Sequence, residues 1–144
     1  MEHTAKLLLR EVFTVGPDET INAVTRIMRS RHVGCVVVAQ KDKIVGIFTE
    51  RDLLNRVAAE GIDGNTTPVS KVMTPDPICV APGEPLQRVF ELLSQRRFRH
   101  VPIAEEGRAV GMVSLSDFAG VLKEVFSEER YAQYFVAYWQ QRES

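Results

Sequence analysis

The stretch Gly46-Ile47-Phe48-Thr49-Glu50-Arg51-Asp52 recurs 65 residues later as Gly111-Met112-Val113-Ser114-Leu115-Ser116-Asp117. Both copies read glycine, two apolar residues, a hydroxyl residue, two further residues and aspartate. Apolar residues with strand character precede each hydroxyl residue, and apolar residues at helical spacing follow it. Each copy is therefore expected at a junction between a strand and a helix. A copied junction predicts a chain in which one structural unit is used twice.

The repeat extends over most of the chain. Shifted by 65 residues, positions 12–57 align with positions 77–122 without a gap, and ten aligned pairs are identical. In both copies four apolar residues follow the spacing i, i+3, i+6, i+7, which marks one face of a helix. They are Ile21, Val24, Ile27 and Met28 in the first copy, and Leu86, Val89, Leu92 and Leu93 in the second.

The pattern around these helices predicts an α+β fold. Two short apolar runs follow each helix, at 33–39 and 44–49 and at 101–104 and 109–114, before a second helix begins. Each half therefore reads strand, helix, strand, strand, helix. Because a unit of about 50 residues buries too little apolar surface to be stable alone, the halves are expected to pack sheet against sheet with pseudo-two-fold symmetry.

The tail beyond Lys123 has no partner in the first repeat. Its aromatic residues follow a helical spacing, which predicts an amphipathic C-terminal helix with an aromatic face. Two roles stay open for this face: it covers the protein's own core, or it is a surface for self-association. The residues are Tyr131, Tyr134, Phe135, Tyr138 and Trp139.

The composition argues against several classes of protein. Eighteen Lys and Arg against nineteen Asp and Glu give a net charge of −1, which argues against a dedicated nucleic-acid or membrane-surface protein. The longest apolar run, Val33–Ala39, is shorter than the roughly 20 residues that span a bilayer. No signal-peptide core is found near the N-terminus, and two cysteines cannot form a disulfide framework. We therefore expect a cytoplasmic protein without a membrane or nucleic-acid partner.

No catalytic motif or metal-ligand spacing is present. The three histidines His3, His32 and His100 are scattered, and no nucleophile elbow or phosphate loop occurs. Cys35 and Cys79 are expected to act as small hydrophobic residues in or near strands. A thiol-dependent enzyme that uses either cysteine is the least favoured alternative.

The repeated junction has a ligand-binding interpretation. Its glycine lacks a Cβ, so another backbone or a flat ring can approach closely. Its hydroxyl residue stands at a helix N-terminus, where free N–H groups suit a phosphate, and the aspartate can accept two hydrogen bonds from a ribose diol. A hydroxyl residue followed three positions later by an acid is also a helix-capping signal that needs no ligand. Both interpretations stay open at this stage.

The chain resembles a CBS-domain pair, also called a Bateman module, from Val12 to Lys123. The motif glycine-apolar-apolar-Thr/Ser-x-x-Asp and the segment Arg99-His100-Val101-Pro102-Ile103 carry the resemblance. It implies two β-α-β-β-α repeats with two clefts between them, and Ala5–Arg10 matches the family's short lead-in helix. The predicted parts are a lead-in helix at 1–11, repeats at 12–60 and 77–123, a linker at 61–76 and the aromatic helix at 124–144.

The resemblance also implies ligands and site residues. CBS clefts commonly take AMP, ADP, ATP, NAD(H) or S-adenosylmethionine, and two pairs often form a disc-like homodimer. By this resemblance Asp52 and Asp117 would hold ribose hydroxyls, and Thr49 and Ser114 would contact ribose or phosphate. Arg99 and His100 would meet phosphate. Thr14 would add a hydroxyl to a site shared by the two repeats.

The two clefts are expected to differ, because Gly34 and Cys35 occupy the places of Arg99 and His100. The cleft with Thr14, Ser114 and Asp117 is predicted to be the preferred one. The sequence does not decide which cleft receives Arg99 and His100.

These observations predict a non-catalytic regulatory module. It would bind an adenine nucleotide or dinucleotide and act as an energy or redox sensor on an unknown regulated protein, by shifting populations between arrangements of the repeats. The alternative is an interaction or scaffold protein that dimerises with degenerate clefts and no nucleotide.

Overall fold

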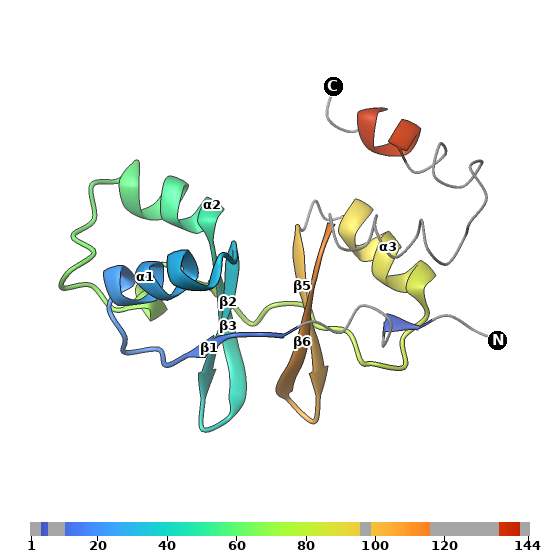
Figure 1. Cartoon of the computed structure of the whole chain (residues 1–144), viewed down its shortest axis with the longest axis horizontal. Helices are drawn as coiled ribbons and strands as arrows, with labels where there is room; N and C mark the ends of the chain where they lie inside the picture. The colour runs from blue at the N-terminus through green and yellow to red at the C-terminus, as the bar shows by residue number, and fades with distance from the viewer. Residues whose placement is uncertain (1–3, 6–10, 96–98, 116–135, 142–144) are drawn as a thin grey trace.

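The computed structural model describes residues 4–5, 11–95, 99–115 and 136–141. They form two lobes, each a small sheet with helices on its outer face, and the two sheets face each other at the centre of the molecule (Figure 1). The fold is therefore α+β with the sheets packed together, as the repeat predicted.

The first lobe holds a four-stranded sheet with the order β1-β2-β3-β4. Strand β1 is parallel to β2, whereas β3 is antiparallel to both β2 and β4. The elements are β1 (Thr14–Val15), α1 (Ile21–Arg31), β2 (Cys35–Gln40), β3 (Lys43–Thr49), α2 (Glu50–Asp52), which continues as the π-helical turn η2 (Leu53–Ala58), the 3-10 turn η3 (Val69–Lys71) and β4 (Thr74–Pro75).

The second lobe repeats this plan. It contains α3 (Leu86–Gln95), followed by the antiparallel hairpin of β5 (His100–Glu105) and β6 (Arg108–Ser114). Val80 pairs with Ile103 in parallel, which is the pairing that Val15 makes with Val38 in the first lobe. The predicted order of elements is thus confirmed in both repeats up to Leu115, where the next helix begins.

Helix α1 has ends that the local sequence explains. The Thr20 hydroxyl accepts a hydrogen bond of 3.2 Å from the N–H of Ala23, which caps the first turn. His32 adopts the left-handed conformation at φ 55° and ends the helix. The chain then turns directly into β2.

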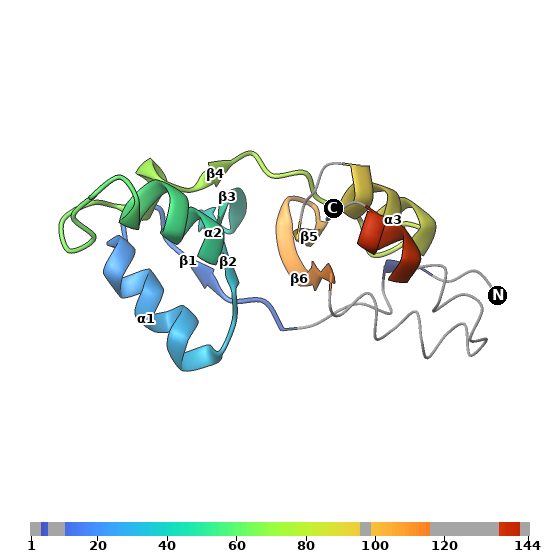
Figure 2. The ribbon, with the colours of Figure 1, turned by 90° about the horizontal axis from the view of Figure 1, so that it is seen from above.

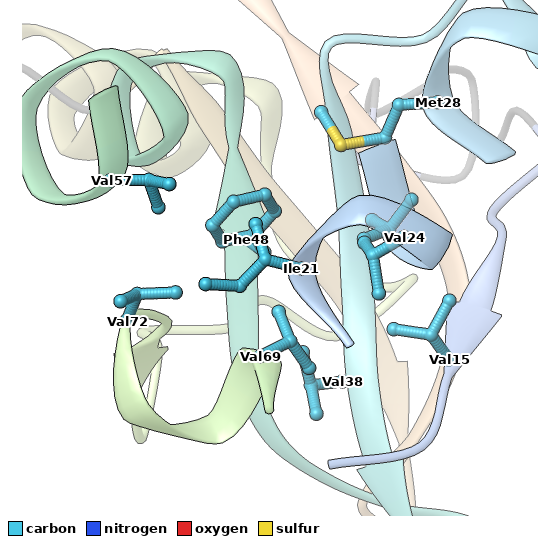
Figure 3. Close-up of a cluster of buried hydrophobic side chains, with 10 residues drawn as sticks. Val15, Ile21, Val24, Met28, Val38, Phe48, Val57, Val69 and Val72 are labelled. Atoms are coloured by element: carbon cyan, nitrogen blue, oxygen red, sulfur yellow. The ribbon is translucent and has the colours of Figure 1, made fainter. Parts of the chain in front are cut away.

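Each lobe has its own apolar core. In the first lobe the predicted helix-face residues Ile21, Val24 and Met28 are buried against Phe48 of β3 (Figure 3). The other members of this cluster are Val15, Val36, Val38, Val57, Val69 and Val72. The second core contains Val80, Leu86, Val89, Leu92, Leu93, Val101, Ile103 and Val113.

A third cluster joins the lobes. Cys35, Val37, Ile47 and Met112 are buried between the two sheets. Side chains of β2 and β3 alternate in direction, so one face of each strand fills the first core and the other meets the second repeat. Each sheet is therefore covered by its own helices on one side and by the other repeat on the opposite side.

The hairpin tips reinforce this contact. The N–H of Ile44 donates to the carbonyl oxygen of Gly107 at 3.0 Å, and the Lys43 ammonium donates to the carbonyl of Glu106. An exposed ion pair of 3.6 Å joins Arg108 to Asp42. Backbone and side-chain contacts together fix the register of one sheet against the other.

The N-terminus packs on the second lobe, although the first repeat follows it in the chain. Ala5 is fully buried in the second core, and its N–H donates to the carbonyl of Glu84 at 2.7 Å. Thr4 pairs with Pro85. Residues 6–10 of the predicted lead-in helix lie outside the described residues.

The described end of the C-terminal helix covers residues 136–141. Tyr138 contacts Phe90 of α3 with ring centroids 5.5 Å apart, and Trp139 packs against the second core. These two residues support the prediction that the aromatic face covers the protein's own core. Tyr131, Tyr134 and Phe135 lie outside the described residues.

The connecting segment, residues 72–79, leads from η3 through β4 to the second lobe. Figure 2 shows it crossing from the first lobe to the second beyond β4. Strand β4 lies close against Gly46 of β3, where a Cβ would meet the Met73 sulfur at 2.5 Å and the Thr74 carbonyl oxygen at 3.0 Å. The first motif glycine therefore permits the close approach of a backbone, which is one of the two uses expected for it.

We predict that Gly46→Ala destabilises the fold by about 1–3 kcal/mol, because the added methyl group must displace the Met73 side chain and press against the Thr74 carbonyl oxygen. Gly83→Ala is the matched control, since a Cβ there would meet nothing within 4 Å. Urea unfolding measures both. Equal stabilities of the two variants would contradict the packing described.

Candidate functional site

A cavity of about 400 Å³ opens between the lobes. Three parts of the chain form its walls: the end of β3 with the start of α2, the connecting segment, and the start of β5. The lining residues are Ile47, Thr49, Glu50, Arg51 and Asp52 from the first repeat, Thr74, Asp76, Pro77 and Ile78 from the connecting segment, and Arg99 and His100 from the second repeat.

The repeated motif forms a capping box at this cavity. Thr49 is the N-cap of α2, and its hydroxyl accepts a hydrogen bond of 3.2 Å from the N–H of Asp52. In return, the Asp52 carboxylate oxygen Oδ2 accepts one of 3.0 Å from the N–H of Thr49. The capping interpretation of the motif is thus correct for the first repeat, and it leaves the other carboxylate oxygen of Asp52 for further contacts.

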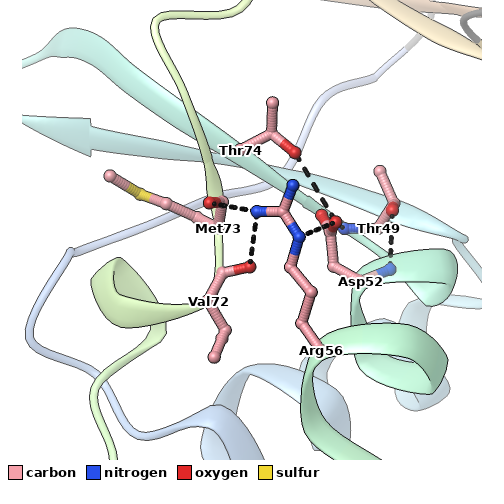
Figure 4. Close-up of polar contacts among 6 residues, drawn as sticks. All are labelled: Thr49, Asp52, Arg56, Val72, Met73 and Thr74. Carbon is pink, nitrogen blue, oxygen red and sulfur yellow. Dashed lines mark hydrogen bonds and ion pairs between the residues drawn. The ribbon is translucent and has the colours of Figure 1, made fainter. Parts of the chain in front are cut away.

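That second oxygen, Asp52 Oδ1, has two longer contacts (Figure 4). The Thr74 hydroxyl donates to it at 3.5 Å, and Nε of Arg56 lies 3.5 Å away. The residue is 7% exposed, so its charge is largely removed from water. A carboxylate offers about four acceptor positions, and long contacts fill them poorly, so Oδ1 can accept hydrogen bonds from a bound molecule.

The same main-chain hydrogen bond positions the motif in both repeats. The N–H of Glu50 donates to the carbonyl of Gly34 at 2.9 Å, and the N–H of Leu115 donates to that of Arg99 at 3.1 Å. Each second helix therefore starts beside the residue that precedes the central hairpin. In the second repeat that residue is Arg99, and it lines the cavity together with His100, the first residue of β5.

The charges of the cavity are mixed. Arg51 and Arg99 supply positive charge, while Glu50, Asp52 and Asp76 supply negative charge. Ile47, Pro77 and Ile78 add apolar surface. Apolar walls with a few placed polar groups are the usual make-up of a small-molecule site.

Four of the seven residues predicted for a site meet in this cavity: Thr49, Asp52, Arg99 and His100. The sequence left open which cleft receives the basic pair, and in the structure this pair lines the same cavity as the first repeat's motif. Thr14 is exposed, Ser114 is half-buried, and neither lines this cavity. Asp117 lies outside the described residues, so the cleft of Thr14, Ser114 and Asp117 stays a prediction.

Sequence reasoning missed the contribution of the connecting segment. Thr74 and Asp76 fall in the stretch predicted as a linker, yet both line the cavity. The available signal was Thr74-Pro75, since a residue before proline favours an extended backbone and such a segment can add to a sheet edge. Asp76 carried no such signal, because its backbone is left-handed although Pro77 follows it.

The two thiols lie in surroundings that suppress nucleophilic chemistry. Burial, and then the charge of Asp52, raise the pKa of the Cys35 thiol far above its ordinary value. Burial also raises the pKa of Cys79. Since the thiolate is the nucleophile, both residues are poor candidates for catalysis. Among the described residues no three His, Cys, Asp or Glu side chains gather in a way that could hold a metal ion.

The family model described as CBS domain matches twice, at residues 5–59 and 69–124. The CBS domain-containing protein YhcV of Bacillus subtilis is 33% identical over 119 residues, which are 83% of this chain and 84% of that protein. Three other curated relatives are longer proteins, of which the match spans 21, 20 and 22%.

Solved structures agree with this result. The CBS-domain containing protein ATU1752 from Agrobacterium tumefaciens has a TM-score of 0.75 and 35% identity, and the match covers 83% of this chain and 98% of that one. CBSX2, crystallised in complex with AMP, has a TM-score of 0.74 at 19% identity, over 85% of this chain and 98% of that one. The latter likeness shows the fold alone.

In the part of the chain that the structure describes, no helix has the length and apolar character needed to cross a membrane.

The family of the chain follows from three findings. The two repeats have the same order of elements, their sheets pack together, and one family model matches both of them. The chain belongs to the CBS domain family and is a pair of CBS repeats.

Proposed function

We propose that the cavity between the repeats binds an adenine nucleotide and that the protein is a non-catalytic regulatory module. The observation that carries this proposal is that one cavity is lined by Asp52 of the first repeat and by Arg99 and His100 of the second. The AMP complex of CBSX2, a protein of the same fold, supports an adenine ligand.

The lining residues suit the parts of such a ligand. Asp52 accepts hydrogen bonds from the ribose diol through Oδ1, and Thr49 contacts the ribose or phosphate. Arg99 and His100 meet the phosphate, because a guanidinium and an imidazole both donate to phosphate oxygens. Ile47 and Ile78 offer apolar surface to the adenine ring.

The size of the cavity favours a mononucleotide. About 400 Å³ lies near the lower end of the range for small-molecule sites. AMP therefore fits better than NADH, which carries a second nucleotide, and an energy sensor is favoured over a redox sensor. ADP, ATP and S-adenosylmethionine remain members of the ligand panel to be tested.

Regulation would follow from the position of the site. A ligand that touches both repeats and the connecting segment favours one arrangement of the lobes, provided that it binds the alternatives unequally. A separate regulated protein would respond to that arrangement. A homodimeric assembly and a cytoplasmic location stay predictions, to be tested by light scattering and cell fractionation.

One observation favours the alternative of a scaffold with degenerate clefts. The capping box of Thr49 and Asp52 explains the motif of the first repeat without any ligand. Titration with nucleotides separates the two functions, because a scaffold binds none of them and still assembles.

We predict micromolar binding of AMP in calorimetric titration of nucleotide-free protein. Asp52→Asn should weaken binding at least about tenfold, because hydrogen bonds to a charged acceptor are stronger than those to a neutral one. Asp18→Asn, the same change at an exposed site away from the cavity, is the control. Asp117→Asn reports on the second cleft. Silence toward AMP, ADP, ATP, NADH and S-adenosylmethionine would overturn the proposal.

A second prediction separates capping from ligand binding. Thr49→Ala and Thr20→Ala each remove an N-cap hydroxyl and should each destabilise the fold by about 0.5–2 kcal/mol in urea unfolding. Only Thr49→Ala should also weaken AMP binding, because Thr20 lies at α1, away from the cavity. A ligand affinity that falls equally in both variants would show that stability alone controls it.

The buried thiol of Cys35 predicts how the stability of the fold depends on pH. Because the pKa of Cys35 is higher in the folded than in the unfolded state, its stabilising effect is complete below the ordinary thiol pKa, near 8.5, and is lost as the pH rises above it. Unfolding between pH 7.5 and 10 should show a loss of up to about 1.4 kcal/mol per pH unit from this group. Cys35→Ala should lack that part of the slope, and an unchanged slope would contradict the burial of the thiol.

A further inference from the structure

Arg56 of η2 contacts both the ligand-binding carboxylate and the connecting segment. Its Nε lies 3.5 Å from Asp52 Oδ1, and its Nη1 donates to the carbonyl oxygens of Met73 at 2.9 Å and Val72 at 3.4 Å (Figure 4). A guanidinium can make these contacts together because its donors point along different directions in one plane. One side chain thus bridges the first repeat's motif and the chain that leads to the second repeat.

Stability alone gives little reason for this bridge. The Arg56 side chain is 49% exposed, and an exposed ion pair contributes about 0–1 kcal/mol. The fold does not require an arginine there either, since Val121 stands at the equivalent position after Asp117 in the second repeat. The bridge is a feature of this cleft and not of the repeat.

The connecting segment that Arg56 holds is also a wall of the cavity. Beyond Met73 the chain forms β4, and Asp76 then adopts a left-handed conformation at φ 45° while its N–H donates to Val45 at 3.1 Å. Thr74 contributes a direct second link, because its hydroxyl donates to the same Asp52 oxygen. Downstream, Val80 pairs with Ile103 of the second sheet.

We infer that Arg56 is a positioning residue that couples the nucleotide-binding carboxylate of Asp52 to the connecting segment, and so transmits occupancy of the cleft to the path between the repeats. This inference rests on the proposed function. A ribose diol bound to Asp52 fixes the orientation of the carboxylate, which fixes Arg56 and in turn the carbonyl groups of Val72 and Met73. The contact of Arg56 Nε with Asp52 Oδ1 is long, at 3.5 Å, so a carboxylate held in place by a ribose can shorten it.

The test compares hydrogen exchange and affinity in wild type, Arg56→Met and Arg56→Lys. Methionine keeps an apolar stem and removes every donor, whereas lysine keeps the charge but carries its donors on one nitrogen, in place of the separate Nε and Nη1 that contact Asp52 and Met73. Arg88→Met is the matched control, because Arg88 forms an exposed ion pair with Glu91 on α3, away from the cavity.

Without ligand, both Arg56 variants should exchange about three- to tenfold faster at residues 72–78, with no change in α1. AMP should slow exchange at residues 72–78 in wild type and in Arg88→Met, and should slow it clearly less in the Arg56 variants, in which the Thr74 hydroxyl still links the segment to Asp52. Affinity for AMP should fall about three- to tenfold in Arg56→Met. That loss should vanish in the Asp52→Asn background, because the two residues act as one unit.

Three results would overturn the inference. They are unchanged exchange at residues 72–78 in the ligand-free variants, an equal effect of AMP on this segment in Arg56→Met and wild type, and losses of affinity that multiply in the double variant. The last would mean that Arg56 acts on the ligand independently of Asp52. A wild-type protein that binds none of the five ligands would overturn the proposed function and the transmission with it, while the ligand-free exchange would still decide whether Arg56 holds the segment.

Discussion

The contact between the two sheets is the constraint on which the rest of the structure depends. Each sheet buries one face under its own helices, and the opposite face would be left apolar and exposed without the other repeat. Val37, Ile47 and Met112 show the result, since all three are buried at the centre of the molecule. The hairpin tips of the two sheets contact each other at one end, and the described cavity lies at the other end, where α2 and β5 begin. Packing of the repeats therefore creates the site.

In the proposed site, Asp52 serves stability and binding with different oxygens. Oδ2 completes the capping box with the N–H of Thr49, while Oδ1 has the longer contacts with Thr74 and Arg56. The cap fixes the carboxylate before a ligand arrives, so little conformational entropy has to be lost on binding. The two interpretations of the motif are thus compatible, and a cap at this position is a means of orienting a binding group.

Periodicity made most of the fold predictable. The spacing of Ile21, Val24 and Met28 identified the buried face of α1, and the 65-residue shift identified the second lobe. The cavity was predictable in part, because Thr49 and Asp52 stand in a local motif. Thr74 and Asp76 were missed, since a short strand that adds to a sheet edge has no period of its own. The pairing of Arg99 with the first motif depends on a tertiary crossing that no local pattern encodes.

Differences between equivalent positions decide the chemistry of each cleft. Glycine at position 34 stands where the second repeat has Arg99, and a Cβ there would meet the Glu50 carboxyl carbon at 3.2 Å. The first repeat places Glu50, Arg51 and Asp52 at the cavity, while the second repeat adds Arg99 and His100. At the equivalent positions of the first repeat stand Gly34 and Cys35, which supply neither a cation nor an imidazole. Duplication supplies equivalent geometry, and binding selectivity comes from the residues at which the copies differ.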